Sequence, residues 1–327
     1  MTGGAPFNPK EVIFAPTAAC NLHCAHCRVD RSRGTGAKRL TVERAITFLR
    51  DCADNGIERV GFSGGEPFLA FDFLVALCAE TVNLDLFFDR LMTNGDWYKD
   101  ESELRETLEA VYDAGFDGTI GLSLDDWHGQ DGERAALFLQ AAIEISGRPD
   151  GVEIDSALTA DGRYPTELLK SVAASLSARS GSRADLILDG GLPVAIAGAE
   201  GLRISVTGIP YSRPSDDPEA WKEAAWFKDD WCLGPGNVLY AHADGSVAAC
   251  CGFANERPEL ALGTVDDPVE ALIAAGLSGN HTRLCYQTGL ATYRAELEAR
   301  GFRFPGKTGD ICFFCDWLCA HGPYKQS

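Results

Sequence analysis

Cysteine is the residue type whose spacing in this chain points most directly to chemistry. The 327 residues include twelve cysteines, and most of them fall in clusters. Cys20, Cys24 and Cys27 lie in the segment TAACNLHCAHCRVD, with a C-x3-C-x2-C spacing. Three thiolates this close on one loop can converge on a single metal ion or cluster, because the thiolate is the form of cysteine that binds metals. The segment therefore predicts a metal site near the start of the chain.

The number of local ligands bears on which metal this site holds. Iron-sulfur cubanes normally take four cysteines, so three without a local fourth favour a cluster with one iron left open to another ligand. Zinc is the alternative, because it takes four protein ligands and His23 or His26 could supply the fourth. An open metal position is what a catalytic site needs, and iron-sulfur is the favoured interpretation.

Composition narrows the classes of protein to which the chain could belong. Its apolar content of 45% is enough for a full core, and its formal charge of -19 would repel a phosphate backbone, so we expect no nucleic-acid partner. The sequence has no long uncharged apolar run, and the opening MTGGAPFNPKEVIF lacks the pattern of a secretory signal. We therefore expect a cytoplasmic protein with no membrane partner, where reducing conditions disfavour disulfides.

The apolar patterning from residue 11 to about residue 189 predicts the elements that must position the cysteines. Short β-rich runs alternate with stretches that carry apolar residues at three- and four-residue spacing. This alternation predicts an α/β fold of parallel strands and helical crossovers, arranged as a partial (β/α)6 TIM-like barrel. The expected strands are residues 12–16, 59–62, 86–92, 119–124, 152–157 and 185–188, and the expected helices are residues 42–53, 71–81, 101–114, 132–146 and 166–178.

The same pattern suggests three parts of the chain. Residues 1–189 form the predicted barrel. Residues 190–231 break the rhythm with Gly, Pro and acidic residues, and are predicted to be a connecting segment. Residues 232–327 are dense in cysteine and are predicted to form a small C-terminal domain.

Three further short motifs accompany the N-terminal triplet, each at the end of an expected strand. They are FSGGEPFL after the second strand, TNG after the third and SLDD at the fourth. With the cysteines, they resemble the signature of the radical S-adenosylmethionine (SAM) superfamily, in which three cysteines bind a 4Fe-4S cluster and SAM fills the open iron. His26 departs from the family, which usually has Tyr, Phe or Trp there. The resemblance implies that SAM is bound by Gly64, Gly65, Glu66, Pro67, Asn94, Ser123 and Asp125.

The cysteines from residue 232 onward form a second pattern. C-x12-G-x4-C from Cys232 to Cys250, followed by CFFCDWLC, resembles the auxiliary-cluster extensions called SPASM and twitch domains. The stretch VLYAHADGSVAACC predicts a hairpin with its turn at residues 243–245, which would bring Cys232 and Cys250 together. The shorter twitch type, with one auxiliary 4Fe-4S cluster, fits best. Its implied ligands are Cys232, Cys250, Cys312 and Cys315, and a zinc ribbon on the same residues is the alternative.

Five side chains are candidates for a direct role in the reaction. They are Cys251, Cys285, Cys319, Asp125 and His128. Each spare cysteine is either a redox residue or an ordinary buried one, and Cys319 could also replace one of the four proposed ligands. The acid and the histidine follow the fourth expected strand, where substrate or SAM could be met, although helix capping alone would explain the acid nearly as well. Cys52 and Cys78 stand alone in helical patterns and are expected to be buried.

The resemblance also implies a reaction. In radical SAM enzymes an electron delivered to the cluster cleaves SAM, and the resulting 5′-deoxyadenosyl radical abstracts a hydrogen atom from a C–H bond. The implied partners are a flavodoxin- or ferredoxin-like electron donor and a ribosomally made peptide as substrate; the alternative is a sugar or alcohol that is oxidised. A zinc-binding interaction protein would explain the cysteines, but it gives no reason for GGEP and SLDD at strand ends.

Overall fold

The computed structural model describes residues 6–30, 32–33, 39–159, 162–211, 213–232 and 238–323. Its internal contacts divide the chain into two compact units. The barrel unit comprises residues 15–31 and 60–211, and the auxiliary unit comprises residues 1–14, 32–59 and 212–327. The N-terminal cysteine triplet lies in the barrel unit, and the C-terminal cysteines lie in the auxiliary unit. Each predicted metal site is therefore contained within one unit. The predicted domain boundaries at residues 189 and 231 remain a prediction.

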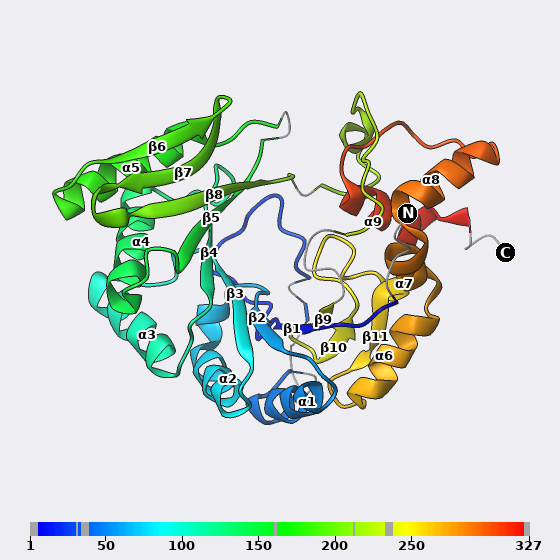
Figure 1. Ribbon diagram of the computed structural model, residues 1–327, viewed down its shortest axis with the longest axis horizontal. Coiled ribbons are helices and arrows are strands. Elements are labelled where there is room, and N and C mark those ends of the chain that lie inside the picture. The colour runs from blue at the N-terminus through cyan, green and yellow to red at the C-terminus, as the bar shows by residue number, and fades with distance from the viewer. Residues whose placement is uncertain are drawn as a thin grey trace. The chain divides into compact units, whose positions relative to one another are not determined.

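Strands and helices alternate in the barrel unit, so the predicted α/β fold is confirmed. The strands β3, β4, β5 and β8 pair in parallel in that order, and β2 adjoins β3. Helices α2 to α5 lie outside the curve of these strands (Figure 1). The strands are β2 (Arg59–Phe62), β3 (Phe87–Thr93), β4 (Thr119–Ser123), β5 (Val152–Ala157) and β8 (Arg203–Ile209). The helices are the short η2 (Pro67–Ala70), α2 (Phe71–Asn83), α3 (Glu101–Asp113), α4 (Gly132–Ser146) and α5 (Thr166–Ser180).

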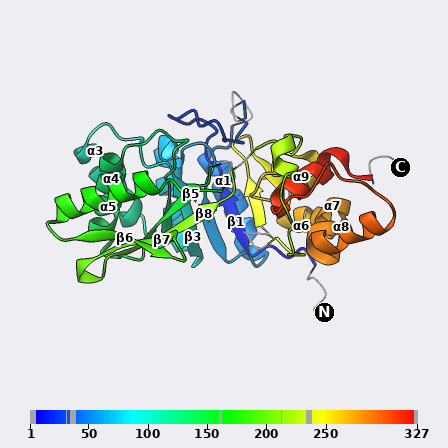
Figure 2. The same ribbon diagram turned by 90° about the horizontal axis from the view of Figure 1, so that it is seen from above.

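One part of the predicted barrel is wrong. The sixth expected strand is β6 (Ala184–Asp189), which lies at the edge and pairs antiparallel with β7 (Leu192–Gly198), followed by the short η3 (Ala199–Gly201). The strand beside β5 is instead β8, so residues 190–231 are not merely a connection. Gly190 and Gly191 both have positive φ, at 55° and 86°, which suits a two-residue hairpin turn. Figure 2 shows β6 and β7 side by side.

Local sequence explains where the barrel helices begin and which face they bury. The carboxylate of Asp100 accepts a hydrogen bond from the amide of Glu103 at 3.0 Å and caps α3. Leu104, Leu108 and Val111 recur at helical spacing and are fully buried. Both features can be found from the sequence alone, and the helix accordingly starts where the pattern predicts.

The auxiliary unit contains the second set of strands, in the order β11-β10-β9-β1, with β1 parallel to β9. The predicted hairpin is confirmed, because β9 and β10 are antiparallel and His242 N donates to Ser246 O across the turn. The strands are β1 (Glu11–Phe14), β9 (Val238–Ala241), β10 (Ser246–Ala248) and β11 (Ala261–Thr264). The helices are α1 (Val42–Asp54), η4 (Pro218–Trp221), η5 (Pro258–Leu260), α6 (Val269–Ser278), α7 (Asn280–Arg283), η6 (Leu284–Thr288), α8 (Leu290–Ala299) and α9 (Ile311–His321).

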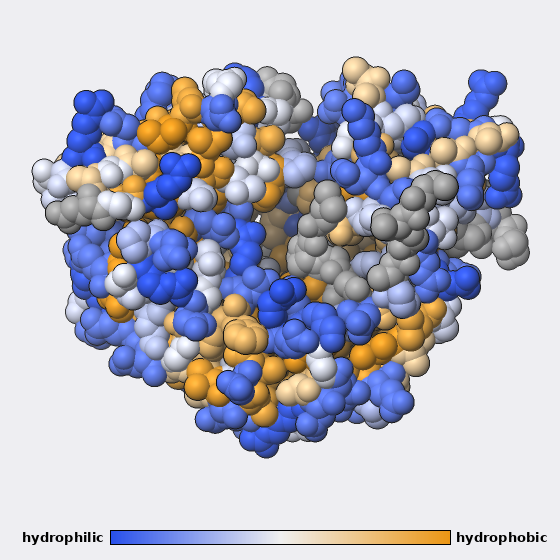
Figure 3. Space-filling view, viewed as in Figure 1, coloured by the Kyte–Doolittle hydropathy of each residue, from blue (hydrophilic) through white to orange (hydrophobic). Residues whose placement is uncertain are grey.

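The surface is mixed in character. On the face seen in Figure 3, hydrophilic residues predominate and apolar ones form separate patches. Among the described helices, none has both the length and the apolar content needed to cross a membrane.

Candidate active site and auxiliary metal centre

A single pocket in the barrel unit gathers most of the residues predicted near the N-terminal cysteines. It has an empty volume of about 650 Å³. The triplet, the two glycines of GGEP, Asn94 and Ser123 all line it, which is the arrangement that the motifs predict. The lining residues are Cys20, Cys24, His26, Cys27, Ser63, Gly64, Gly65, Met92, Thr93, Asn94, Ser123 and His128.

The two glycines hold the cysteine loop against β2. Gly65 N donates to Thr17 O at 2.9 Å, and Glu66 N donates to Ala19 O at 2.8 Å. A Cβ at Gly65 would lie 2.1 Å from Ala19 O, and Gly64 has a φ of +115°. The close approach of the two backbones therefore requires glycine at both positions. GGEP thus fixes the loop that carries the cysteines.

The side chain of Glu66 turns away from this pocket and joins two motifs. It is fully buried, and its two oxygens accept hydrogen bonds from Thr93 Oγ1 at 2.9 Å, Asn94 N at 2.8 Å and Phe68 N at 3.2 Å. Burial raises the pKa of Glu66 to about 7, against the opposing effect of these hydrogen bonds. Pro67 is also buried and does not line the pocket. Glu66 therefore holds the TNG turn in place beside GGEP.

We expect Glu66 to make stability depend on pH. Its carboxyl has a pKa of about 7 when folded, against an ordinary value of 4.5, so between these values the folded chain holds a proton that the unfolded chain releases. The free energy of unfolding should therefore fall as pH rises from 4.5 to 7, by up to about 3 kcal/mol. Urea unfolding of wild type and Glu66→Gln at several pH values measures this, since the variant should lack that fall. The same dependence of the free energy of unfolding on pH in the two proteins would contradict this role of Glu66.

Asn94 reaches from the TNG turn to the cysteine loop. Its Nδ2 lies 3.5 Å from Cys20 Sγ and 2.9 Å from Asn21 Oδ1. Leu22 N also donates to Cys20 Sγ, at 3.4 Å. Burial raises the pKa of the Cys20 thiol, whereas these donors favour the thiolate. Asn94 is therefore placed to orient a metal-bound Cys20.

Asp125 and His128 form one hydrogen-bonded group after β4. The carboxylate of Asp125 is almost fully buried and accepts from the amides of Trp127 and His128, while its Oδ1 lies 2.8 Å from His128 Nδ1. Its other oxygen accepts from Ala157 N at 3.2 Å. Burial alone would raise the pKa of Asp125, but His128 lowers it. The acid therefore positions His128, which lines the pocket, and does not line the pocket itself.

The neighbouring acids give a matched test of this role. We expect Asp125→Asn to lower the free energy of unfolding by about 1–3 kcal/mol, because an amide cannot accept from all four donors. The same change at Asp126, whose side chain is exposed, should have an effect within about 0.5 kcal/mol. Urea unfolding of both variants provides the measurement. Equal effects would show that Asp125 does not organise the loop.

His26 lies among aromatic rings, where the sequence departs from the family pattern. Its ring centroid is 5.0 Å from that of His128 and 5.9 Å from that of Tyr211. The ring centroids of Trp127 and Tyr211 are 4.6 Å apart, with the ring planes tilted by 47°. Burial lowers the pKa of His26. Possible metal-ligand atoms of His26, Asp125 and His128 lie within 4.8 Å of one another, and a 2.8 Å contact joins the acid to His128. The imidazole thus occupies the place of an aromatic ring beside the third cysteine.

In the auxiliary unit, five cysteines line one apolar cavity. Four of them are the predicted cluster ligands, and the fifth is Cys285, one of the spare thiols. Burial raises the pKa of the Cys250 thiol to about 12, so a thiolate in this cavity needs a metal to stabilise it. The cavity-lining cysteines are Cys232, Cys250, Cys285, Cys312 and Cys315. Their convergence fits a metal centre with cysteine ligands.

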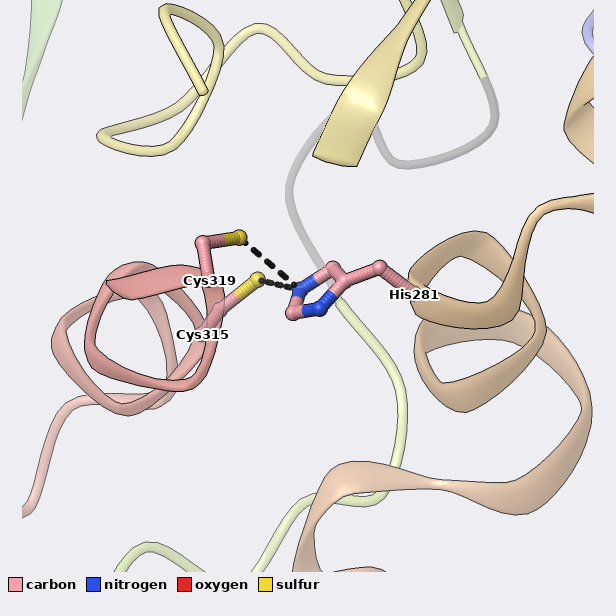
Figure 4. Close-up of side chains that lie close together, drawn as sticks. All are labelled: His281, Cys315 and Cys319. Atoms are coloured by element: carbon pink, nitrogen blue, oxygen red, sulfur yellow. Dashed lines mark hydrogen bonds between the residues drawn. The ribbon is translucent and has the colours of Figure 1, made fainter. Parts of the chain in front are cut away.

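The remaining C-terminal donors lie beside this cavity. Cys319 is fully buried, and its Sγ lies 3.3 Å from His281 Nε2. The same nitrogen lies 3.2 Å from Cys315 Sγ (Figure 4). Cys251 does not line the cavity. His281 is absent from the sequence predictions, although its position four residues before Cys285 places both on one helical face and could have marked it.

A comparison with protein families matches the N-terminal part of the chain. Residues 14–135 match the family model described as the Radical SAM superfamily. This range includes the cysteine triplet, GGEP, TNG and SLDD. Residues 14–135 form a radical SAM domain.

Curated relatives agree over the same part of the chain. A probable GTP 3′,8-cyclase of Methanocella arvoryzae is 32% identical over 143 residues, which are 44% of this chain and 41% of the relative. An AdoMet-dependent heme synthase of Methanosarcina barkeri is 30% identical over 145 residues, which are 43% of this chain and 40% of the relative. The chain thus matches only about two fifths of the length of these relatives.

Solved structures resemble more of the chain. Native anSMEcpe with bound AdoMet, another name for SAM, has a TM-score of 0.53 and 16% identity, covering 86% of this chain and 84% of that one. BtrN in complex with AdoMet and 2-DOIA has a TM-score of 0.51 and 14% identity, covering 88% of this chain and 89% of that one. At these identities the likeness shows a shared fold, which extends beyond the radical SAM domain.

The residues in the pocket fit the cofactors that radical SAM domains use, which are a 4Fe-4S cluster and SAM. Three cysteines from one loop face the same pocket, and the described residues lining it include no fourth cysteine. This donor set would leave one iron open for SAM. The cysteine-lined cavity of the auxiliary unit likewise suits an auxiliary cluster.

Proposed function

We propose that this chain is a radical SAM enzyme that acts on a peptide. The observation that carries the proposal is the pocket in which Cys20, Cys24 and Cys27 face the GGEP and TNG backbones. When bound, the cluster and SAM supply a reductive cleavage that yields a 5′-deoxyadenosyl radical, which takes a hydrogen atom from a C–H bond of the substrate. A flavodoxin- or ferredoxin-like protein is the proposed electron donor.

The chain's own residues would hold and orient these groups. Cys20, Cys24 and Cys27 are the proposed iron ligands, and Asn94 supports the first of them through its Nδ2 contact. The backbone of Gly64 and Gly65 and the side chain of Ser123 line the pocket and are proposed SAM contacts. Asp125 is a positioning residue for His128, through their 2.8 Å contact. His128 faces the pocket, where it could meet SAM or substrate.

The auxiliary centre is proposed as a second 4Fe-4S cluster. Its proposed ligands are Cys232, Cys250, Cys312 and Cys315, because these four converge on one cavity and their spacing resembles a twitch domain. Cys285 lines the same cavity, and its Sγ lies 3.8 Å from Cys315 Sγ. Cys285 is therefore the alternative to Cys315 as the fourth ligand. A cluster with four protein ligands has no open iron for substrate and would serve as an electron carrier. It would accept an electron from the substrate radical in an oxidation.

Two classes of substrate have specific support. The peptide proposal is supported by the shared fold with anSMEcpe, which was also solved with AdoMet and the Kp18Cys peptide, at a TM-score of 0.52 and 14% identity. Oxidation of a small molecule is the second candidate, supported by the shared fold with BtrN, which was solved with 2-DOIA. Both candidates need the same cofactors and the same radical chemistry.

Anaerobic reconstitution tests the proposal. The loaded chain should hold about eight irons and, with SAM and dithionite, should form 5′-deoxyadenosine detectable by mass spectrometry. Peptides encoded beside the chain's gene should increase that yield, whereas sugars or alcohols should increase it if the second candidate is correct. Zinc in place of iron at the N-terminal loop, or no cleavage of SAM, would overturn the proposal.

A further inference from the structure

Helix α9 presents three cysteines that do not have the same surroundings. Cys312, Cys315 and Cys319 recur at three- and four-residue spacing and therefore share one face of the helix. The first two line the cavity, whereas Cys319 is fully buried and does not. The thiol of Cys319 instead contacts the ring of His281, which lies at the start of α7. His281 is only 2% exposed. A buried imidazole thus lies within hydrogen-bond distance of Cys315, a proposed cluster ligand.

The Nε2 atom of His281 faces two sulfur atoms at hydrogen-bond distance. It lies 3.2 Å from Cys315 Sγ and 3.3 Å from Cys319 Sγ, as the dashed lines in Figure 4 show. One ring nitrogen carries either one hydrogen or one lone pair, so it cannot make a full hydrogen bond with both. A metal-bound thiolate carries negative charge and is the stronger acceptor of the two. Once Cys315 is bound to iron, the N–H should therefore favour Cys315.

We propose that His281 is a positioning residue for the auxiliary cluster, which donates its Nε2 hydrogen to the Cys315 thiolate and thereby raises the reduction potential of that cluster. This inference rests on the proposed auxiliary cluster. Reduction adds an electron, and a donor aimed at a ligand sulfur stabilises the more negative state. Cys319 shares the donor and so weakens the effect.

Two variants predict shifts of opposite sign. His281→Leu removes the donor, so the midpoint potential of the auxiliary cluster should become more negative. One charge-assisted hydrogen bond corresponds to about a tenfold change in the redox equilibrium, which is ~59 mV for a one-electron couple. Cys319→Ala leaves the donor to Cys315 alone, so the midpoint should become more positive. His281→Gln keeps an N–H at a similar reach and should restore part of the shift.

Potentiometric titration followed by electron paramagnetic resonance measures both midpoints in the reconstituted full chain. The N-terminal cluster provides an internal reference, and its midpoint should stay unchanged. His242→Leu is the matched control, because it removes a buried imidazole of the same unit whose Nε2 lies 3.2 Å from a carbonyl oxygen, that of Asn255. Its auxiliary midpoint should equal that of wild type.

The failures of the two proposals are distinguishable. A wild-type chain without a second cluster signal would overturn the proposed auxiliary cluster. An intact cluster whose midpoint is the same in all His281 and Cys319 variants would overturn the role of His281.

Donor atoms of His281, Cys315 and Cys319 lie within 4.8 Å of one another, a spacing that could also hold one ion. One equivalent of zinc in wild type that is lost in His281→Leu would therefore overturn the role too. If His281→Leu does not load with iron, the Cys319→Ala variant tests the role of His281 instead. A midpoint potential that does not become more positive in Cys319→Ala would then overturn that role.

Discussion

Cys24→Ala should abolish cleavage of SAM, with a loss of more than about three orders of magnitude in 5′-deoxyadenosine formation. Cys24 lines the pocket together with the other two cysteines of the triplet, and no further cysteine among the described lining residues could replace it. The variant should keep the auxiliary cluster, because all C-terminal cysteines lie in the other unit. Iron content should therefore fall from about eight to about four per chain.

Cys78→Ala is the control for this experiment. Cys78 is fully buried in α2 of the same unit, away from the pocket lining, and burial raises the pKa of its thiol to about 12. Its removal should leave iron content and SAM cleavage unchanged. Full cleavage by Cys24→Ala, or loss of all iron from it, would contradict the assignment of the triplet to a separate catalytic cluster.

Gly65→Ala should have the second large effect. The added Cβ would lie 2.1 Å from Ala19 O and 2.7 Å from Ala19 C, both of them backbone atoms. The cysteine loop must then move away from GGEP and lose its hydrogen bonds from Gly65 N and Glu66 N. We expect a fall of about 2–4 kcal/mol in the free energy of unfolding, and SAM binding weaker by about a hundredfold or more.

Gly309→Ala is the corresponding control, because its added Cβ would meet no atom closer than 3.7 Å. It should bind SAM as wild type does. Equilibrium binding of SAM to each reconstituted protein and urea unfolding provide the two measurements. Wild-type affinity in Gly65→Ala would show that the cysteine loop does not depend on this contact.

The sequence predicts the regular part of the barrel closely, because local signals coincide there with tertiary packing. Helix α4 occupies residues 132–146 as expected, with Asp131 as its cap. The β6–β7 hairpin and β8 were missed because Gly190 and Gly191 suggest a break as readily as a tight turn. Which strand pairs with β5 depends on contacts far apart in the sequence, and no local pattern specifies it.

The candidate site divides in the same way. Spacing alone brings the N-terminal triplet together, because one loop carries all three cysteines. Cys52 and Cys78 are buried in helices, as their surroundings predict. The place of His281 depends on how α7 packs against α9, two elements separated by about thirty residues. A lone histidine in a sequence is usually an ordinary core or surface residue, so its approach to two sulfurs becomes evident only in the folded chain.

The pairing of β1 with β9 has a consequence for biosynthesis. Glu11 lies opposite Val238, so this pairing of one of the first strands to leave the ribosome can form only after more than two hundred residues have been translated. The barrel unit, complete at residue 211, can close earlier. Cluster insertion at the N-terminal loop can thus precede insertion at the C-terminal cysteines. A stop codon placed after residue 211 would remove β9, which pairs with β1, as well as the auxiliary ligands, and so would not yield an intact single-cluster enzyme.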